Sequence, residues 1–393
     1  MKAPEFYRGR EQTYIKHFFL EKYLERVAFN ILSGSDEFVY VDGFAGPWQA
    51  ADESLEDTSF VIAINQLRKV RDALRDRSGK SVRIRCLFSD SNPVAFESLQ
   101  RAVGNVSDIE VHAVCSNFEQ LVPAVVNYAG SAFCLLFIDP TGWTGFGLAA
   151  LKPALRLRGE VIINLMSDFL NRFIDHPSAE VAASLDLLFG DDDWLSDVNA
   201  IVASGATREQ AVLTTYLARL RNAGGYKHVT STRVLKPLSD RSYFHLVYGT
   251  RHWKGVKEFR SVEERVVDEQ ERVRDAAKMD FRVASTGQSE LLLGPSESGS
   301  LNFRTERQRN LDDARQRLRS VLSSRRRILY EDLLGEVLEI PLVWERDIKE
   351  ALRAMRAEGT IEIPALVGRA TTPKPGQEIS WTGTSTDRSP PWM

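Results

Sequence analysis

Apolar and polar residues alternate along the first 260 positions in a way that predicts strands separated by helices. Five runs rich in β-branched and aromatic residues have the length of buried strands: 38–42, 84–90, 109–114, 133–139 and 160–166. The segments between them are amphipathic and long enough to be helices. This alternation favours an α/β fold, with a mostly parallel sheet and helices on both faces.

Further elements flank the five strands. Residues 11–32 have apolar side chains at helical spacing, and a helical stretch at roughly 178–223 follows the fifth strand. Residues 226–237 and 243–250 predict two strands joined by a turn. Five parallel strands followed by an antiparallel hairpin are the arrangement of the class I methyltransferase sheet, which is Rossmann-like. This likeness is an analogy between folds and by itself implies no chemistry.

The pattern changes near residue 284. Residues 284–300 are rich in Gly and Ser and predict a linker or surface loop. Beyond an arginine-rich helix, the sequence predicts helices at 328–339 and 344–359 and strands at 360–367 and 378–381, an order typical of a winged helix. The predicted domains are a methyltransferase-like α/β domain (1–260), a helical and linker region (261–320) and a winged-helix-like domain (321–393).

Composition narrows the class of protein. A chain of 393 residues with 43% hydrophobic residues has room for two or three domains. No apolar run approaches the roughly 18 residues of a membrane span, and the first residues lack a signal-peptide core, so we expect a cytoplasmic protein. The three cysteines lack zinc or disulfide spacing, so no metal is predicted. The net charge is −3, but residues 303–327 contain nine arginines against three acidic residues, a stretch that predicts contact with phosphates.

The loop after the first strand is the first candidate for ligand binding. It consists of Asp42, Gly43, Phe44, Ala45 and Gly46. Ligands of open α/β sheets bind beyond the carboxyl ends of the strands, where glycine permits close backbone approach or a positive φ. An ordinary turn at a strand end is the alternative. Trp48 follows and either packs over a ligand or narrows its pocket.

Polar residues end the second and third strands. Asp90 is placed to accept both ribose hydroxyls of an adenosine cofactor through its two oxygens, and a solvated turn aspartate is the alternative. Ser116 and Asn117 end the third strand, where they can address an adenine edge. Capping of the following helix explains these two residues as well or better.

The segment Phe137–Gly147, after the fourth strand, is the most specific local signal. The Asp139 carboxylate and the Pro140 carbonyl can both accept hydrogen bonds from an amino group, and Trp143 can supply a stacking face. A flipped nucleobase needs this combination of acceptors and aromatic surface. A plain turn with a packed tryptophan is the alternative.

Two further sets of residues are weaker candidates. Asn164, Asp168 and Arg172 follow the fifth strand at a spacing of four and can line a cleft, although a surface ion pair is the commoner explanation. Lys16 and His17 lie on the first helix, where they either cover a cofactor or are plain helix residues.

Several of these motifs together resemble the three-Cys-motif partner family (TcmP) over most of residues 10–260. The matching segments are KHFFLEKYL (16–24), YVDGFAGP (40–47), DTSFVIAI (57–64), FIDPTGW (137–143), IINLMSDFLNR (162–172) and YFHLVYGTRHWKG (243–255). The resemblance implies that residues 42–46 form the S-adenosylmethionine loop and that Asp139 and Pro140 form the catalytic turn. It also implies a separate partner protein that carries the three cysteines.

The sequence therefore predicts an S-adenosylmethionine-dependent methyltransferase that modifies a nucleobase nitrogen in RNA or DNA. A cytosine-C5 mechanism is disfavoured because no cysteine follows a proline, and a dehydrogenase is disfavoured because GxGxxG is absent. The alternative is a non-catalytic scaffold that binds nucleic acid or protein. The predicted helix 344–358 has balanced charge, which favours a protein partner or a homodimer over DNA.

Overall fold

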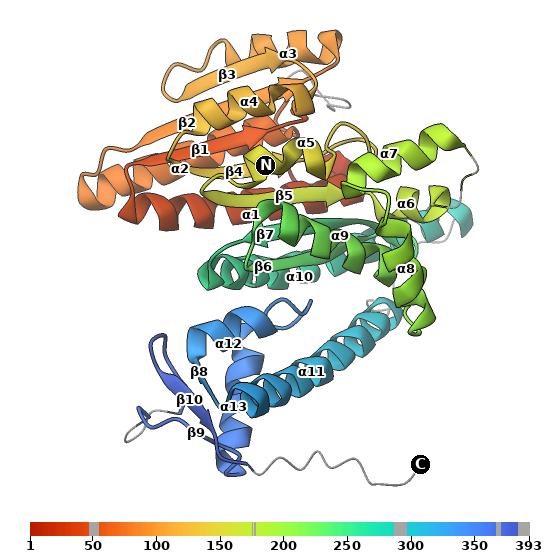
Figure 1. Ribbon diagram of the computed structural model, residues 1–393. Coiled ribbons are helices and arrows are strands. Elements are labelled where there is room, and N and C mark those ends of the chain that lie inside the picture. Colours follow the sequence, from red (N-terminus) through yellow and green to blue (C-terminus); the bar gives the residue numbers. More distant parts are fainter. Residues whose placement is uncertain (47–54, 175, 177, 287–296, 367–370, 384–393) are drawn as a thin grey trace. The chain divides into compact units, whose positions relative to one another are not determined.

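A computed structural model describes residues 1–46, 55–174, 176, 178–286, 297–366 and 371–383 (Figure 1). The chain divides into two compact units. The first unit comprises residues 1–251 and 265–296, and the second comprises residues 252–264 and 297–393.

The first unit contains a seven-stranded sheet. Its strands are β1 (Glu37–Asp42), β2 (Arg83–Asp90), β3 (Glu110–Cys115), β4 (Phe133–Ile138), β5 (Gly159–Leu165), β6 (His228–Leu235) and β7 (Ser242–Thr250). Their order is β3-β2-β1-β4-β5-β7-β6. Strands β1 to β5 are parallel, and β7 is antiparallel to both β5 and β6. The predicted parallel sheet with a closing hairpin is confirmed.

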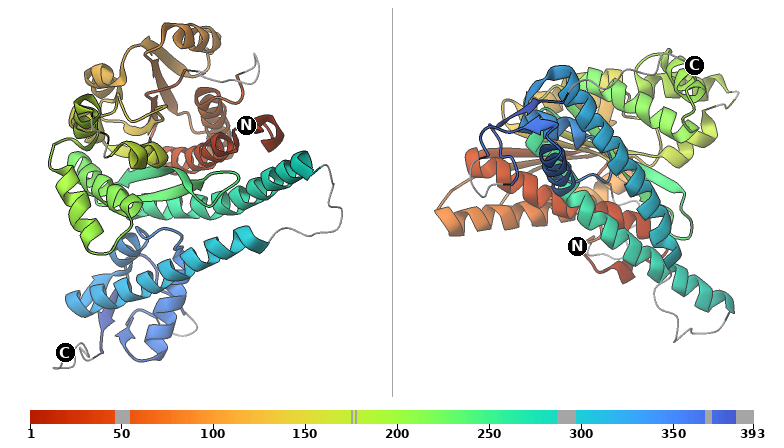
Figure 2. Two further views of the ribbon diagram at one scale, coloured as in Figure 1. Left: turned by 90° about the vertical axis from the view of Figure 1, so that its right-hand side faces the viewer. Right: turned by 90° about the horizontal axis from the view of Figure 1, so that it is seen from below.

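Helices connect the strands. They are α1 (Glu11–Gly34), α2 (Ser59–Ser78), α3 (Pro93–Val103), α4 (Phe118–Ala129), α5 (Leu148–Leu155), α6 (Ser167–Phe173), α7 (Ala179–Phe189), α8 (Trp194–Ala203), α9 (Arg208–Gly224) and α10 (Trp253–Thr286), with a short 3₁₀ helix at Pro4–Tyr7. Two further views show the helices of this unit lying on both faces of its sheet (Figure 2). None of the helices in the described part of the chain combines the length and the apolar character of a membrane span.

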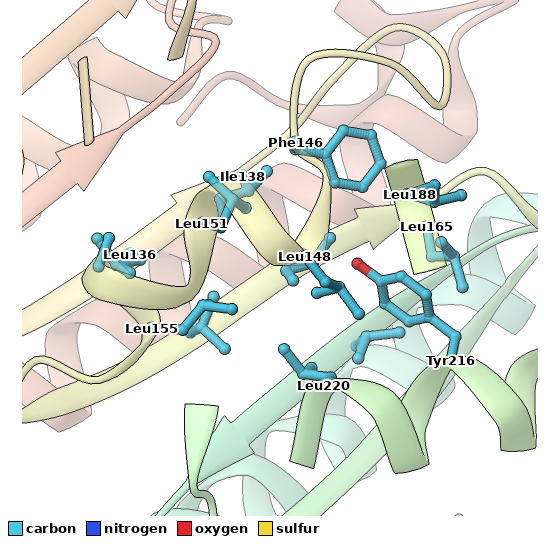
Figure 3. Close-up of a cluster of buried hydrophobic side chains, with 14 of the residues drawn as sticks. Leu136, Ile138, Phe146, Leu148, Leu151, Leu155, Leu165, Leu188, Tyr216 and Leu220 are labelled. Atoms are coloured by element: carbon cyan, nitrogen blue, oxygen red, sulfur yellow. The ribbon is translucent and has the colours of Figure 1, made fainter. Parts of the chain in front are cut away.

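One face of the sheet packs against α4, α5, α7 and α9. Leu151 and Leu155 of α5, Leu220 of α9, Leu136 of β4 and Leu165 of β5 belong to one cluster of buried side chains (Figure 3). All five side chains are at most 2% exposed, and each contributes about 1.5–3 kcal/mol by leaving water. This apolar layer holds the ends of β4 and β5 in place.

The opposite face packs against α1 and α2, with polar links through the layer. Tyr23 of α1 donates to Glu160 of β5 at 2.6 Å, and its hydroxyl lies 2.8 Å from that of Tyr248 on β7. The ring of Phe60 on α2 lies 5.9 Å from that of Phe88 on β2. These contacts bring the first turn of α1 and the start of α2 to the carboxyl edge of the sheet.

The second unit contains a three-stranded antiparallel sheet with helices. Its elements are α11 (Glu297–Arg325), β8 (Arg327–Leu329), α12 (Tyr330–Val337), α13 (Glu345–Ala357), β9 (Ile361–Glu362) and β10 (Glu378–Trp381), with strand order β8-β10-β9. The first turns of α10 also belong here. Buried Arg260 donates to the carbonyls of Leu338 at 2.8 Å and Glu339 at 3.0 Å, and Glu263 accepts from the amide of Leu342.

Some predicted boundaries were wrong. Residues 284–286 continue α10, and residues 297–300 begin α11, so the Gly/Ser-rich segment is helical at both ends. Residues 287–296 lie outside the described part. Strand β8 was not predicted because three residues are too few to show a period of two. All three cysteines are free and lie within strands.

Candidate functional site

Asp42 ends β1 and organises the loop that follows it. Its side chain is fully buried, with Oδ1 accepting from the Phe44 amide at 3.1 Å and Oδ2 from the Ser59 hydroxyl at 2.7 Å. Desolvation outweighs these two bonds and raises the pKa of Asp42 to about 7. Asp42 therefore acts on the loop and on the start of α2, and does not line the neighbouring cavity.

Gly43 and Gly46 are glycines because other groups approach their backbone closely. A Cβ at Gly43 would lie 2.8 Å from the ring of Phe118, and a Cβ at Gly46 would lie 2.1 Å from Oδ2 of Asp90. Neither has a positive φ. Ala45 between them is buried, and its amide donates to the Ser89 carbonyl at 2.8 Å. Of the two expected uses of glycine, the structure shows close approach.

Asp90 ends β2 and binds backbone amides. Oδ2 accepts from Gly46 at 2.9 Å and Oδ1 accepts from Asn92 at 2.7 Å, and the residue is only 4% exposed. The sequence predicted that these two oxygens receive ribose hydroxyls. In the structure they hold the loop after β1 against β2, and Asp90 does not line the cavity.

The other predicted cofactor residues, Ser116 and Asn117, follow β3 outside the cavity. Asn117 Oδ1 accepts from the amide of Glu119 at 2.9 Å and so caps α4. Ser116 donates to the Asn117 carbonyl at 3.1 Å. These bonds match the capping alternative rather than the adenine-edge prediction.

Trp143 packs away from the cavity. Its ring centroid lies 4.9 Å from that of Phe173 on α6, and its indole nitrogen donates to Ser184 of α7 at 2.9 Å. It does not line the cavity, so the packed-tryptophan alternative describes it. Trp48 lies outside the described residues.

A cavity of about 470 Å³ opens at the carboxyl ends of β1, β4 and β5. Strands β1 and β4 are neighbours, although β2 and β3 come between them in sequence, so this is the point at which the strand order reverses. The predicted site residues that line it are Phe44, Gly46, Asp139 and Pro140, together with the weaker candidates Lys16, His17 and Asn164. Among the described residues, the cavity is also lined by Gly9, Arg10, Gln12, Thr13, Asp57, Thr58, Ser59, Thr141, Met166, Tyr243 and Phe244.

Lys16, Asp139 and Asn164 form a chain of polar contacts in the cavity wall. Lys16 Nζ lies 2.5 Å from Asp139 Oδ2, and Asn164 Nδ2 donates to Asp139 Oδ1 at 2.7 Å. The Lys16 and Asp139 side chains are 13% and 11% exposed. The lysine charge compensates the carboxylate, and both carboxylate oxygens already have partners.

A second ion pair and a neutral histidine complete the polar wall. Arg10 donates to Asp57 Oδ2 at 2.9 Å. His17 Nδ1 lies 3.2 Å from the hydroxyl of Tyr7, and burial together with the charge of Lys16 holds the pKa of His17 well below its ordinary value. His17 is therefore uncharged at neutral pH.

Some predicted candidates lie elsewhere, and others were missed. Asp168 pairs with Arg172 at 2.5 Å and with Lys236 at 2.8 Å, as the ion-pair alternative expects. Asp168 and Arg172 also line a second cavity of about 280 Å³, separate from the one that Asn164 lines. Arg10 and Asp57 were missed because they are 47 residues apart and only the fold brings them together.

Most arginines of residues 303–327 are paired within the second unit. Carboxylates lie within 4 Å of Arg307, Arg315, Arg317, Arg319, Arg325 and Arg327. Four of these pairs use acids from α12, α13 and β10, which a local count of charge does not include. Over residues 297–393, sixteen lysines and arginines face fifteen acidic residues. The segment is therefore far less basic in the fold than in the sequence.

Comparison with known proteins gives little guidance. The sequence matches no family model and no curated protein. Twenty-eight chains of solved structures match it. One is protein LPL1258 of Legionella pneumophila, of family model DUF519, which is 10% identical with a TM-score of 0.35 and covers 60% of this chain and 85% of its own. Another is a loganic acid methyltransferase with SAH, which is 11% identical with a TM-score of 0.28 and covers 68% and 89%. Scores this low support no conclusion about activity.

Proposed function

We propose that the protein is an S-adenosylmethionine-dependent methyltransferase and that the cavity between β1 and β4 holds the cofactor. The observation that carries the proposal is the position of this cavity. It lies at the switch point of a sheet with five parallel strands and a closing antiparallel hairpin, where sheets of this kind bind their ligands. Its volume of about 470 Å³ is in the range of small-molecule sites.

The lining residues fit the groups of this cofactor. S-adenosylmethionine has a carboxylate, an ammonium group, a sulfonium centre and an adenosine. Lys16 and Arg10 are cations suited to the carboxylate, while Asp57 is an anion suited to the ammonium group. The aromatic ring of Phe44 offers a stacking surface. When bound, the cofactor supplies an already activated methyl group, so the main task of the protein is positioning.

Calorimetry tests the cofactor site. Titration of the full chain with S-adenosylmethionine and S-adenosylhomocysteine is expected to show one site per chain. Lys16→Met is expected to weaken binding at least tenfold because it removes a cation suited to the cofactor's carboxylate. Asp168→Asn, on α6 outside the cavity, is the matched control and should bind as the wild type does. Absence of wild-type binding at millimolar cofactor contradicts the proposal.

The acceptor that we propose is a nucleobase nitrogen in RNA or DNA. Tyr243 and Phe244 line the cavity and offer the aromatic surface expected earlier of Trp143, and the Pro140 carbonyl remains a candidate acceptor. The element order of the second unit (α11, β8, α12, α13, β9, β10) supports a winged-helix-like domain that contacts the substrate or the three-Cys-motif partner of the TcmP resemblance. Labelled methyl transfer to total RNA and to DNA, with Asp139→Ala as the negative control, tests this.

A non-catalytic scaffold is the second candidate. It is favoured by one observation: both oxygens of Asp90 accept backbone amides, so the acid expected for ribose is already engaged. A scaffold predicts nucleic-acid or protein binding that is independent of S-adenosylmethionine, and no methyl transfer even when a partner is present. Cofactor-dependent transfer to any substrate rules it out.

A further inference from the structure

Asn164 has a hydrogen-bond acceptor that no described residue uses. The residue lies in β5, is 2% exposed and lines the cavity. Its Nδ2 donates to Asp139 Oδ1 at 2.7 Å and lies 3.7 Å from the sulfur of Met166. Its Oδ1 is buried and accepts no hydrogen bond within the described part of the chain. An unsatisfied buried acceptor is costly, so its presence in a cavity wall points to a ligand that donates to it.

The orientation of this amide is set by its neighbours. The Lys16 ammonium lies 2.5 Å from Asp139 Oδ2 and forms an ion pair with the Asp139 carboxylate. An ionised carboxylate only accepts hydrogen bonds, so the NH₂ group of Asn164 must face it. The reversed amide would place two oxygens 2.7 Å apart. Asp139 is therefore a positioning residue that turns Oδ1 of Asn164 away from itself.

We propose that Asn164 Oδ1 accepts an N–H from the amino group of the methyl acceptor, and that the substrate is therefore a base with an exocyclic amine. This inference rests on the proposed methyltransferase function and gives its substrate class. The sequence assigned this contact to Asp139, but Lys16 and Asn164 already occupy both of its oxygens. Asn164 Oδ1 is a buried acceptor beside Asp139 that has no donor among the described residues.

The role of Asn164 is recognition and orientation, because a neutral amide does not take up a proton at neutral pH. In the transfer, the lone pair of the amine forms the new N–C bond while the C–S bond of the methyl donor breaks. The sulfur leaves as a neutral thioether, and the methylated nitrogen then loses one proton to water. Accepting one N–H holds the amine with its lone pair free for this step.

The test compares bases with and without the amine. The full chain is saturated with S-adenosylhomocysteine and titrated by NMR with adenosine and purine riboside, and separately with cytidine and 2-pyrimidinone riboside. Each pair differs only in the exocyclic amine. The wild type is expected to bind one amino nucleoside about 10- to 100-fold more tightly than its partner, because the amine-free base leaves the acceptor unpaired.

Two variants locate the discrimination. Asn164→Leu removes the acceptor and is expected to abolish the preference for the amine. Asp139→Asn keeps the shape but presents an NH₂ to residue 164, so the Asn164 amide reverses and the preference is again lost. Asp168→Asn is the matched control and should keep the preference. Thermal unfolding of each variant identifies any loss of fold. If one of the two variants does not fold, the other still tests the inference.

Three results overturn the inference. The first is that Asn164→Leu prefers the amino nucleoside as strongly as the wild type does. The second is that the wild type shows no preference for the amino nucleoside, or binds no nucleoside at millimolar concentration. The third is that Asn164→Leu weakens S-adenosylhomocysteine and leaves nucleoside preference intact, which would assign Oδ1 to the cofactor's own adenine. Failure of the proposed function is a separate result: the wild type then does not bind S-adenosylhomocysteine. The nucleoside titrations can still be run in the absence of S-adenosylhomocysteine.

Discussion

Replacement of Asp42 by asparagine is expected to remove a pH dependence of stability. Burial raises the pKa of this carboxyl from 3.8 to about 7 in the folded chain. Asparagine is isosteric and can keep both contacts, accepting from the Phe44 amide with Oδ1 and donating to the Ser59 hydroxyl with Nδ2. The variant therefore differs from the wild type mainly in lacking the titration.

The direction in which wild-type stability changes with pH follows from the protonation of Asp42 in the folded and the unfolded chain. Below pH 3.8 the Asp42 carboxyl is protonated in both the folded and the unfolded chain, and it has no pH effect. Between pH 3.8 and about 7 the unfolded chain releases the proton and the folded chain retains it, so wild-type stability falls as pH rises. Because folding raises the pKa of Asp42 by about 3, the free energy of unfolding falls by at most about 4 kcal/mol between pH 3.8 and pH 7.5.

Urea unfolding of both proteins at pH 4.5, 5.5, 6.5 and 7.5 measures this effect. Buried His17 has a lowered pKa and changes stability in the opposite direction, because the stability that it contributes is lost as pH falls below the ordinary pKa of histidine. His17 is present in both proteins, so its effect cancels in the difference between Asp42→Asn and wild type. That difference should grow with pH by a few kcal/mol. Asp36→Asn, at an exposed carboxyl, controls for the substitution. A difference that is constant from pH 4.5 to 7.5 refutes the reasoning.

Three further predictions concern the loop, the tryptophan and the arginines. Gly46→Ala places a Cβ 2.1 Å from a carboxylate oxygen and should cost about 2–4 kcal/mol in thermal unfolding and weaken cofactor binding, whereas Gly34→Ala, with no atom within 4 Å, should change stability by less than about 1 kcal/mol; equal effects would contradict the loop geometry. Trp143→Phe should lower the free energy of unfolding by about 1 kcal/mol, because it loses the indole hydrogen bond, and should leave the preference for amino nucleosides intact. Loss of that preference would indicate that Trp143 contacts the substrate. Any nucleic-acid affinity should fall less than about 100-fold between 50 and 200 mM salt, because most arginines of residues 303–327 are paired, and a steeper fall in binding assays would contradict that pairing.

The strands were predictable because their signal is local. Each buried parallel strand is a short apolar run, and the acids Asp42, Asp90 and Asp139 mark where the strands end. Once the strands are known to be parallel, these acids must share one edge of the sheet. The prediction of that edge as the site region therefore needed only alternation and strand direction.

The partners of those acids were not predictable from local sequence. Asp90 is engaged by the amide of Gly46, 44 residues earlier, and Asp139 by Lys16 and Asn164, which come from a helix and a strand far apart in the chain. Such contacts depend on the path of loops and on which rotamer fits. Apolar patterning sets the layers of a fold and leaves these choices open.

The predicted basic character of residues 303–327 was also affected by contacts between residues far apart in the chain. The nine arginines of residues 303–327 were weighed against the acids of the same stretch. In the fold, Arg307 pairs with Asp347 of α13, and Arg325 pairs with Glu336 of α12. Electrostatic character belongs to a surface, so a sum over consecutive residues overstated the basic character of this segment.

Photochemical crosslinking of methyl-labelled S-adenosylmethionine to the full chain, followed by tryptic mapping, tests the central claim most directly. Residues 242–251 and 11–16 form tryptic peptides that contain Tyr243, Phe244 and Lys16 of the cavity wall. The cavity assignment predicts label in one or both peptides, removed by excess S-adenosylhomocysteine. Label confined to peptides of residues 297–393, or no competed label at all, would contradict it.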